Sequence, residues 1–334
     1  MSVETGVAYF EGRARRHILP DLDDMVASGC TYVVHCMSEF DARWQRETVA
    51  RLVAETKARG MRVWLDPYGV GEVFGGEPFS RFGAVHPDAR QLDSTGRPTT
   101  RACPNQPAFR EWVYRWLDDA ATVGAEMIFW DEPTWDVRER GAVWSCRCER
   151  CRAGFRERFG AEMPEDYVDE VKAFQELSMA ELLGDVCERA HRLGMENAVC
   201  IMPPEASNPG FRDWDRAASI RGLDNFGTDP YWFSFLPPGE GSAAAYVGEH
   251  ARRTVEVADR HGIDHHVWIQ AFEVPAGRER EIDEAIDAAV AAGARNLAAW
   301  SYDGCDAMSS CTSERPEETW AAVARSFRRV RDRA

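Results

Sequence analysis

Short apolar runs rich in β-branched and aromatic residues alternate with longer amphipathic stretches along the whole chain. Runs of the first kind predict strands, and the stretches between them predict helices. We expect eight strands, at residues 6–10, 31–37, 62–66, 126–131, 198–202, 225–229, 266–271 and 296–301. Helices are expected at residues 41–59, 107–123, 173–193, 243–261, 278–292 and 316–331.

The order of these elements predicts a (β/α)₈ TIM barrel. Glycines suited to helix C-caps end many of the helices, and the next strand follows within a few residues, as in βα units with right-handed crossovers. We expect residues 1–334 to form a single catalytic domain, with long loops after the third and fourth strands and an insertion at residues 133–169. A doubly wound open sheet is the alternative, but it would need a glycine-rich phosphate turn after the first strand, where the chain reads Phe10-Glu11-Gly12-Arg13.

Composition and charge narrow the choice of partners. The 334 residues carry 40 basic and 56 acidic side chains, and the net charge of −16 repels nucleic acid and anionic membranes. The sequence has no apolar run long enough for a membrane span, and its first residues lack the apolar core of a signal peptide. We therefore expect a cytoplasmic protein without nucleic-acid or membrane partners, and homo-oligomers stay possible.

Four cysteines stand out among the ten in the chain. Cys146, Cys148 and Cys151 lie within six residues, and Cys103 precedes a predicted helix. Four thiolates in tetrahedral arrangement form a closed structural Zn²⁺ site. Such an ion would pin the insertion after the fourth strand to the loop after the third. The alternative is a group of unliganded surface thiols. No motif for an organic cofactor is present.

Carboxylates collect at the ends of the predicted strands, where TIM-barrel enzymes carry their chemistry. They are Glu39, Asp66, Asp131, Glu132, Glu205, Asp229, Glu273 and Asp303. The pair Asp131-Glu132 is the sharpest candidate, because it directly follows an apolar strand and precedes Pro133. Alternatively, Asp131 caps the next segment and Glu132 is solvated. Glycoside cleavage needs two such groups, one to protonate the leaving oxygen and one to attack or to activate water.

Part of the chain resembles the catalytic barrel of family 42 β-galactosidases. The resemblance rests on the segment from Cys103 to Arg110, the acidic pair after the fourth strand, and the Cys-x-Cys-x-x-Cys run of residues 146–151 followed by Phe155. It implies a barrel glycosidase whose four cysteines bind zinc beside the active site. Asp131-Glu132-Pro133 is similar to the Asn-Glu-Pro motif of the same clan, which implies that Glu132 is the general acid/base.

The second catalytic carboxylate is less evident. The clan places its nucleophile at the end of strand seven, where this chain has Gln270 or Ala271, and Glu273 comes two or three residues later. A second resemblance is to a group of hypothetical barrel glycosidases, in which strands four, six and seven end in Asp, an Asp-x-x-Tyr-like segment and Trp-x-Gln. That resemblance implies Asp229 as the catalytic partner, and Asp131 is the other candidate.

Further strand-end residues are expected to contact a sugar. Tryptophan faces stack on sugar C–H groups, and polar side chains bind hydroxyls; the candidates are His35, Asp66, Tyr68, Trp232, Gln270, Glu273, Trp300 and Asp303. The favoured hypothesis is a zinc-stapled glycoside hydrolase acting on a small saccharide or glycoside. The alternatives are a sugar-binding barrel that has lost hydrolysis and an aldose or sugar-phosphate isomerase.

Overall fold

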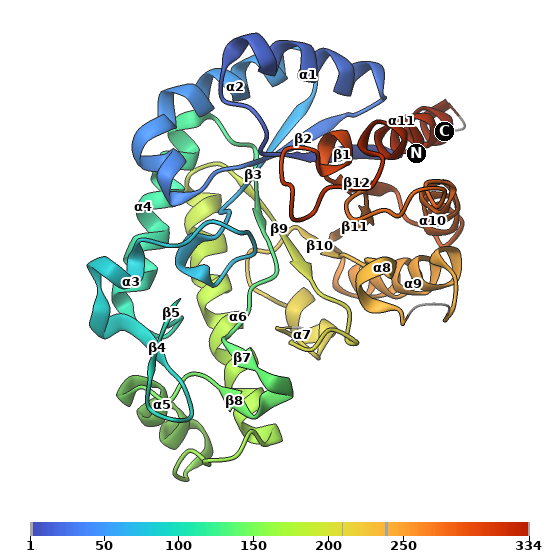
Figure 1. The fold of residues 1–334 in the computed structure, drawn as a ribbon. Coiled ribbons are helices and arrows are strands. Elements are labelled where there is room, and N and C mark those ends of the chain that lie inside the picture. The colour runs from blue at the N-terminus through green and yellow to red at the C-terminus, as the bar shows by residue number, and fades with distance from the viewer. Residues whose placement is uncertain (1–2, 209, 238–239, 333–334) are drawn as a thin grey trace.

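Eight parallel strands close into a barrel at the centre of the molecule (Figure 1). The computed structural model describes residues 3–208, 210–237 and 240–332. Around the barrel the strand order is β1-β12-β11-β10-β9-β6-β3-β2, so neighbours along the chain are neighbours in the sheet. The strands are β1 (Glu4–Tyr9), β2 (Tyr32–Cys36), β3 (Arg62–Asp66), β6 (Met127–Trp130), β9 (Glu196–Ile201), β10 (Asn225–Thr228), β11 (Asp264–Gln270) and β12 (Asn296–Trp300). The predicted TIM barrel is confirmed.

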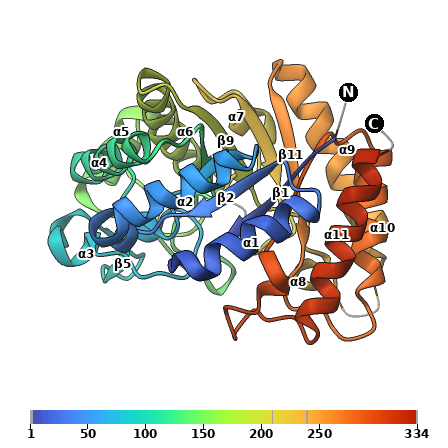
Figure 2. The same ribbon diagram turned by 90° about the horizontal axis from the view of Figure 1, so that it is seen from above.

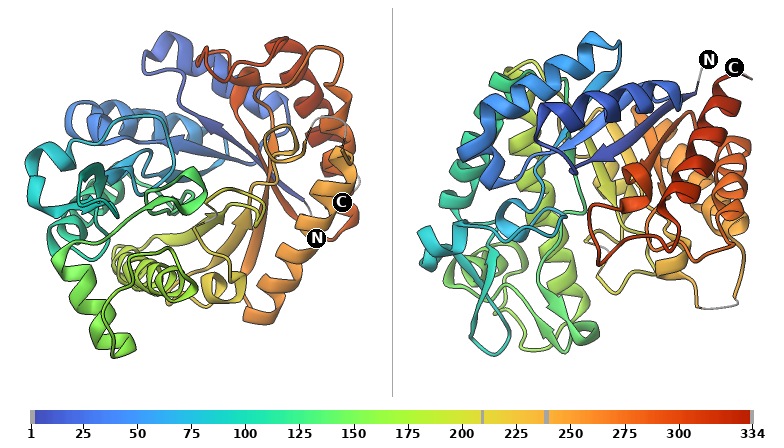
Figure 3. Two further views of the ribbon diagram at one scale, coloured as in Figure 1. Left: turned by 60° about the horizontal axis from the view of Figure 1, so that its bottom comes forward. Right: turned by 45° about the horizontal axis from the view of Figure 1, so that its top comes forward.

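Helices surround the barrel (Figure 3). The longer ones are α1 (Arg15–Ala27), α2 (Arg46–Ala58), α4 (Pro107–Val123), α5 (Glu149–Phe159), α6 (Asp169–Arg192), α9 (Ala243–His261), α10 (Arg280–Ala291) and α11 (Pro316–Asp332). The short ones are α3 (Phe82–Val85), α7 (Trp214–Ala218) and α8 (Trp232–Phe235). Predicted helices 107–123 and 243–261 are confirmed residue for residue.

The structure departs from the predicted helices at two places near the N-terminus. Helix α1 is not among the predicted helices, and its polar sequence contains Pro20, a residue disfavoured inside helices. It packs beside α11 (Figure 2), where Trp320 donates a hydrogen bond to Asp24 at 2.6 Å. The predicted helix at residues 41–59 begins with a π-helical turn, η1 (Asp41–Gln45), before α2.

Side-chain alternation along the strands separates the barrel interior from the surrounding layer. Successive residues of a strand point to opposite faces of the sheet. Ten side chains form the inner cluster: Ala8, Tyr32, Val34, Trp64, Met127, Phe129, Ala198, Cys200, Trp268 and Ala298. Glycines admit the large rings, since a Cβ on Gly6 would lie 2.1 Å from Tyr32 and one on Gly227 would lie 2.2 Å from His266. The intervening strand residues pack against the helices.

Two long excursions leave the barrel after β3 and β6, as the sequence predicts. The first contains the hairpin β4 (Arg90–Leu92) and β5 (Pro98–Ala102), and the second contains β7 (Val137–Arg138), β8 (Val143–Trp144) and α5. A bridge between Asp93 and Ser145 joins the two excursions. Figure 1 shows them together at one side of the barrel.

No helix in the described parts of the chain combines the length and the apolar character needed to cross a membrane.

Candidate functional site

The alternation of the barrel strands determines which residues face the mouth of the barrel. On each strand, the residue two positions after the last member of the inner cluster points the same way and lies at the strand end or at the start of the following loop. The residues reached in this way are Phe10, Cys36, Asp66, Asp131, Met202, Asp229, Gln270 and Trp300. Three aspartates therefore converge on the carboxyl end of the barrel, the end that carries the active site in TIM-barrel enzymes.

Asp66 and Asp229 are buried carboxyl groups that form no ion pair with the described basic side chains. Asp66 is 0% exposed and Asp229 is 1% exposed, and neither oxygen of either group has a hydrogen-bond partner among the described residues. Burial raises the pKa of Asp66 well above its usual range, and the charges of Glu77 and Glu132 act in the same direction. Burial also raises the pKa of Asp229, with Glu132 as the largest electrostatic contributor. An unpaired buried carboxyl group marks a candidate functional site.

Asp131 and Glu132 bring two more carboxyl groups to the same space. Burial, and then the charge of Glu132, raise the pKa of Asp131. Glu132 has a left-handed φ of 35°, which ends the strand alternation directly after Asp131. This turn lets two consecutive carboxylates serve one site, whereas a continued strand would send them to opposite faces.

The chain between β3 and α3, residues 67–81, covers Asp131, and we call this segment the cover loop. Its Gly75 donates a backbone hydrogen bond to the Asp131 carbonyl at 2.9 Å. A Cβ on Gly75 would lie 2.3 Å from Asp131 Oδ2, so only glycine fits at this contact. The cover loop therefore rests directly on one of the clustered carboxylates.

Gln270, at the end of β11, is held by bonds within the protein. Its Oε1 accepts the Phe233 N–H at 2.9 Å, and its Nε2 donates to Ser234 Oγ and the Phe272 carbonyl, both at 3.3 Å. The side chain is 0% exposed. Gln270 therefore positions the segment that follows β10 and is less free to bind a sugar hydroxyl than the sequence suggests.

Three aromatic rings form a wall beside the carboxylates. Phe10 stacks on Tyr68 with ring centroids 5.9 Å apart, and Trp300 lies 5.8 Å from Phe10 and 6.1 Å from Tyr68. The Tyr68 hydroxyl donates a hydrogen bond to Glu77 of the cover loop. Of the predicted residues, Tyr68 and Trp300 thus lie at the mouth with the aspartates.

Two predicted binding residues lie away from the mouth. His35 follows the inward-facing Val34 on β2, so its side chain points away from the barrel interior toward α2. Its Nε2 is 2.9 Å from Thr56 Oγ1 on that helix. Burial lowers the pKa of His35 to about 3. Trp232 is buried on α8, and its indole donates to Glu281 of α10 at 3.0 Å. Neither side chain joins the carboxylate cluster.

Glu273 and Asp303 lie at the periphery. Glu273 is exposed, and its backbone N–H donates to the Cys311 carbonyl at 2.9 Å. Asp303 belongs to a surface hollow shared with Asp306 and Arg315. Burial raises the pKa of Asp303, followed by the charge of Asp306. The structure groups Asp303 with a separate acidic surface rather than with the barrel mouth.

Several residues at the strand ends were not selected from the sequence. Phe10 and Tyr231 each follow an inward-facing residue by two positions, so strict alternation would have identified both. Burial raises the pKa of Tyr231, and the charge of Asp229 adds to the effect. Glu11 directly follows Phe10, and burial raises its pKa to about 8. Nothing in the local sequence marks Glu11 as buried.

The four predicted cysteines form a buried cluster between the excursions. Their sulfur atoms all lie within 4.8 Å of one another, and they are the one such group of potential metal ligands within the described residues. Cys103 Sγ is 3.8 Å from Cys148 Sγ and 3.5 Å from Cys151 Sγ. All four side chains are at most 5% exposed, so they are not the surface thiols of the alternative hypothesis. The cluster could bind a metal ion.

Three nitrogen donors contact the sulfur atoms from outside the cluster, and the longest of these contacts joins Gln106 Nε2 to Cys148 Sγ at 4.0 Å. The Leu92 N–H donates to Cys146 Sγ at 3.4 Å, and the Asn105 side-chain amide donates to Cys151 Sγ at 3.3 Å. Such donors orient ligands and stabilise negative charge on metal-bound sulfur. Leu92 belongs to β4, and Asn105 precedes α4. The donors to the cluster therefore come from the hairpin of the first excursion and from the segment that joins this excursion to α4.

Comparison with known proteins gives a fold and no family. No family model and no curated protein matches the sequence. The endo-1,4-β-mannanase of Rhizomucor miehei is similar in structure, with a TM-score of 0.62 at 10% identity over 98% of this chain and 95% of that one. The endo-β-1,4-mannanase of Thermotoga petrophila has a TM-score of 0.59 at 10% identity over 99% and 77% of the two chains.

Sugar epimerases share the same architecture. A D-psicose 3-epimerase from Clostridium cellulolyticum H10 has a TM-score of 0.51 at 11% identity over 98% of this chain and 99% of that one. The structural neighbours are thus TIM-barrel glycoside hydrolases and sugar epimerases. At these identities the likeness supports the TIM-barrel fold, and function must be argued from the site.

Proposed function

We propose that the protein is a glycoside hydrolase that cleaves an O-glycosidic bond at the mouth of its barrel. The observation that carries the proposal is the convergence of Asp131, Glu132 and Asp229 beside an aromatic wall. Paired carboxyl groups supply the acid and the base or nucleophile of glycoside cleavage. Tyr68 and Trp300 offer ring faces for a sugar. The charge of buried Asp66 contributes to the raised pKa of Asp131.

The electrostatics favour one arrangement of the proton. Burial and the charge of Glu132 raise the pKa of Asp229, which favours a proton on one member of this pair. We assign that proton to Asp229, which is nearly inaccessible to water, and the negative charge to Glu132, which is partly exposed. Asp229 then protonates the leaving oxygen, and Glu132 attacks or activates water. The family 42 resemblance implies instead that Glu132 is the proton donor, and the experiment below separates the two assignments.

We propose zinc as the ion of the four-cysteine cluster. Tetrahedral coordination with Zn–S bonds of ~2.3 Å places sulfur atoms about 3.8 Å apart. The separations of Cys103 from Cys148 and Cys151, 3.8 and 3.5 Å, fit this geometry. Four sulfur ligands leave no open position, so zinc here would stabilise structure. It would fasten the proposed insertion, residues 133–169, to a catalytic domain that comprises residues 1–334.

Two other functions remain as outcomes of the same test. A sugar-binding barrel without hydrolysis agrees with Gln270 at the end of β11, where a nucleophile was expected. A sugar isomerase or epimerase agrees with the fold of one group of neighbours. The convergence of paired carboxyl groups favours hydrolysis over both, because acid/base cleavage of a glycosidic bond uses such a pair.

The experiment measures turnover of a panel of aryl glycosides with good and poor leaving groups. If Asp229 is the proton donor, Asp229→Asn loses most turnover on poor leaving groups and keeps much of it on activated ones. Glu132→Gln then loses turnover on both, and azide partly restores the activity of Glu132→Ala. Asp303→Asn is the matched control, because it removes a carboxylate at the periphery.

The opposite pattern, with Glu132→Gln sensitive to the leaving group and Asp229→Ala rescued by azide, would return the roles to those implied by the resemblance. The configuration of the wild-type product distinguishes a nucleophile, which gives retention, from a base, which gives inversion. Saturable sugar binding without turnover on any glycoside would contradict hydrolysis and support the binding alternative. Interconversion of free sugars without hydrolysis would support an isomerase.

A further inference from the structure

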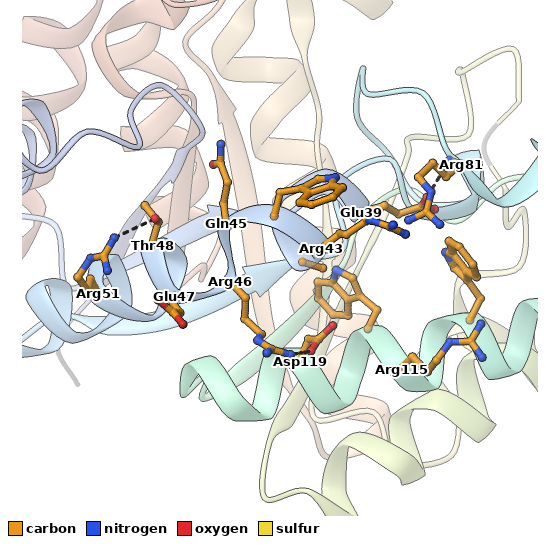
Figure 4. A pocket seen from close by; sticks show the side chains of 14 residues that line it. Glu39, Arg43, Gln45, Arg46, Glu47, Thr48, Arg51, Arg81, Arg115 and Asp119 are labelled. Atoms are coloured by element: carbon orange, nitrogen blue, oxygen red, sulfur yellow. Dashed lines mark hydrogen bonds and ion pairs between the residues drawn. The ribbon is translucent and has the colours of Figure 1, made fainter. Parts of the chain in front are cut away.

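A second hollow lies outside the barrel mouth, between the start of α2 and helix α4 (Figure 4). Its volume is about 670 Å³, within the range of small-molecule sites. It is lined by the π-helical turn η1, the first turn of α2, one face of α4 and Arg81 of the cover loop. None of the groups proposed for hydrolysis lines it.

The lining of this hollow is basic, although the protein as a whole is strongly acidic. Five arginines and three carboxylates line it; they are Arg43, Arg46, Arg51, Arg81 and Arg115 with Glu39, Glu47 and Asp119. Asp119 is paired with Arg46 at 2.6 Å. Glu39 accepts hydrogen bonds from Ser80 Oγ at 2.6 Å and from the Arg81 backbone at 2.8 Å, so its charge is directed at the cover loop.

Three of the arginines face indole rings instead of carboxylates. The guanidinium groups of Arg81 and Arg115 lie 5.4 and 5.3 Å from the Trp112 ring centre, and that of Arg43 lies 4.8 Å from the Trp44 ring centre. None of the three forms an ion pair with the described acidic side chains, in a chain of net charge −16. Cation–π contact orients a guanidinium and leaves its N–H edge available for an anion.

Large apolar side chains are exposed beside these arginines. Trp44 is 66% exposed and Phe40 is 59% exposed, among the most exposed large apolar residues described. Both lie at the turn that precedes α2, and η1 is π-helical, a conformation found frequently at functional sites. An exposed indole next to unpaired guanidinium groups is suited to a ligand that has both an apolar face and a negative charge.

We propose that this hollow, the arginine–tryptophan pocket, binds an acidic saccharide through carboxylates of uronic acid residues. Arg81, Arg115 and Arg43 would contact the carboxylates, and Trp44 would stack on the C–H face of a sugar ring. Guanidinium groups match carboxylates in a planar, two-point arrangement. The choice of a saccharide rests on the proposed function, whereas the preference for an anion rests on the pocket alone.

The experiment measures binding by calorimetry with trigalacturonate and with neutral galactotriose. Trigalacturonate is expected to bind saturably, at least ten times more tightly than galactotriose. The double variant Arg81→Gln/Arg115→Gln is expected to weaken this binding at least tenfold, and Trp44→Ala at least fivefold. Arg192→Gln is the matched control, because it removes one exposed positive charge at the end of α6 and should leave binding unchanged. Should the double variant fold poorly, exposed Arg43→Gln replaces it.

Equal binding of both trisaccharides, no saturable binding, or equal losses in Arg192→Gln would overturn the proposal. A triglutamate peptide that binds as tightly as trigalacturonate would overturn the saccharide assignment and indicate an acidic protein partner. Binding needs no turnover, so its outcome is separate from the test of hydrolysis. If the wild type hydrolyses aryl glycosides but does not bind trigalacturonate, only the proposal for this pocket is contradicted. If it binds trigalacturonate but hydrolyses no aryl glycoside, only the proposed hydrolysis is contradicted.

Discussion

Removing one cysteine of the four-cysteine cluster should loosen the excursions after β3 and β6 while the barrel remains closed. The change is Cys148→Ser, at the residue that precedes α5. Cys103 and Cys146 close a loop of about 44 residues. Treated as a covalent cross-link, closure of such a loop contributes ~4 kcal/mol through the entropy of the unfolded chain, and we expect Cys148→Ser to lose this contribution by losing the ion.

That free energy translates into a measurable shift. At an unfolding entropy of ~2.1 cal/mol/K per residue, the whole chain has ~0.7 kcal/mol/K, so a loss of ~4 kcal/mol lowers Tm by roughly 6 °C. Thermal unfolding of Cys148→Ser checks this value, and a strong chelator should shift the wild type by a similar amount and leave the variant unchanged. Limited proteolysis should cut the variant within residues 133–168 first, because the proposed metal ion would no longer hold that segment.

The matched control is Cys187→Ser, which introduces the same buried hydroxyl on α6 away from the cluster. The prediction requires a larger Tm loss in Cys148→Ser than in this control, together with about one zinc per wild-type chain by elemental analysis. Equal losses in the two variants, or protein purified without metal that melts like the zinc-loaded form, would refute the reasoning.

Three further outcomes follow from the carboxyl-terminal ends of the barrel strands and the cover loop. Gly75→Ala should lower the free energy of unfolding by ~1–3 kcal/mol, because its methyl group overpacks against Asp131, and should also lower kcat. The control is Gly248→Ala in helix α9, where the added methyl group meets only ordinary contacts. This variant should be neutral or stabilising in the same denaturation assay. Because the folded pKa of Asp66 lies above its unfolded value of ~3.9, its stabilising contribution is present below about pH 4 and is lost as pH rises through the folded pKa. Asp66→Asn should therefore raise Tm at pH 8 more than at pH 5, and equal shifts would contradict a raised pKa of Asp66 in the folded protein. Burial raises the pKa of Glu11 from 4.5 to about 8, so stability should fall across that interval, and Glu11→Gln should flatten the measured profile of Tm against pH.

The regular parts of the barrel could be predicted because their patterns are local. Periodicity identified all eight barrel strands, and a helix-breaking glycine after residue 123 or 261 fixed the ends of α4 and α9. Helix α1 escaped prediction because its stability comes from packing on α11 and the barrel, contacts that the local sequence does not display. The cysteine cluster could be predicted because closely spaced thiols are prone to oxidation unless a metal ion binds them.

The candidate site could be predicted only in part, because direction matters as much as position. Asp66, Asp131 and Asp229 were selected as strand-end acids, and alternation along each strand places all three inward. His35 fell on the opposite face of β2 by a shift of one residue. Trp232 was selected as a tryptophan that could stack on a sugar, although Tyr231, two positions after Asp229, is the residue at the mouth.

The left-handed turn at Glu132 makes two adjacent positions mutationally interdependent. A substitution that restores an extended backbone there would redirect the Glu132 side chain and also release Asp131 from its contact with Gly75. The effects of changes at these positions should therefore be strongly non-additive, and a laboratory library that varies them one at a time would miss the functional pairs. Directed evolution of this barrel would have to sample residues 75, 131 and 132 together.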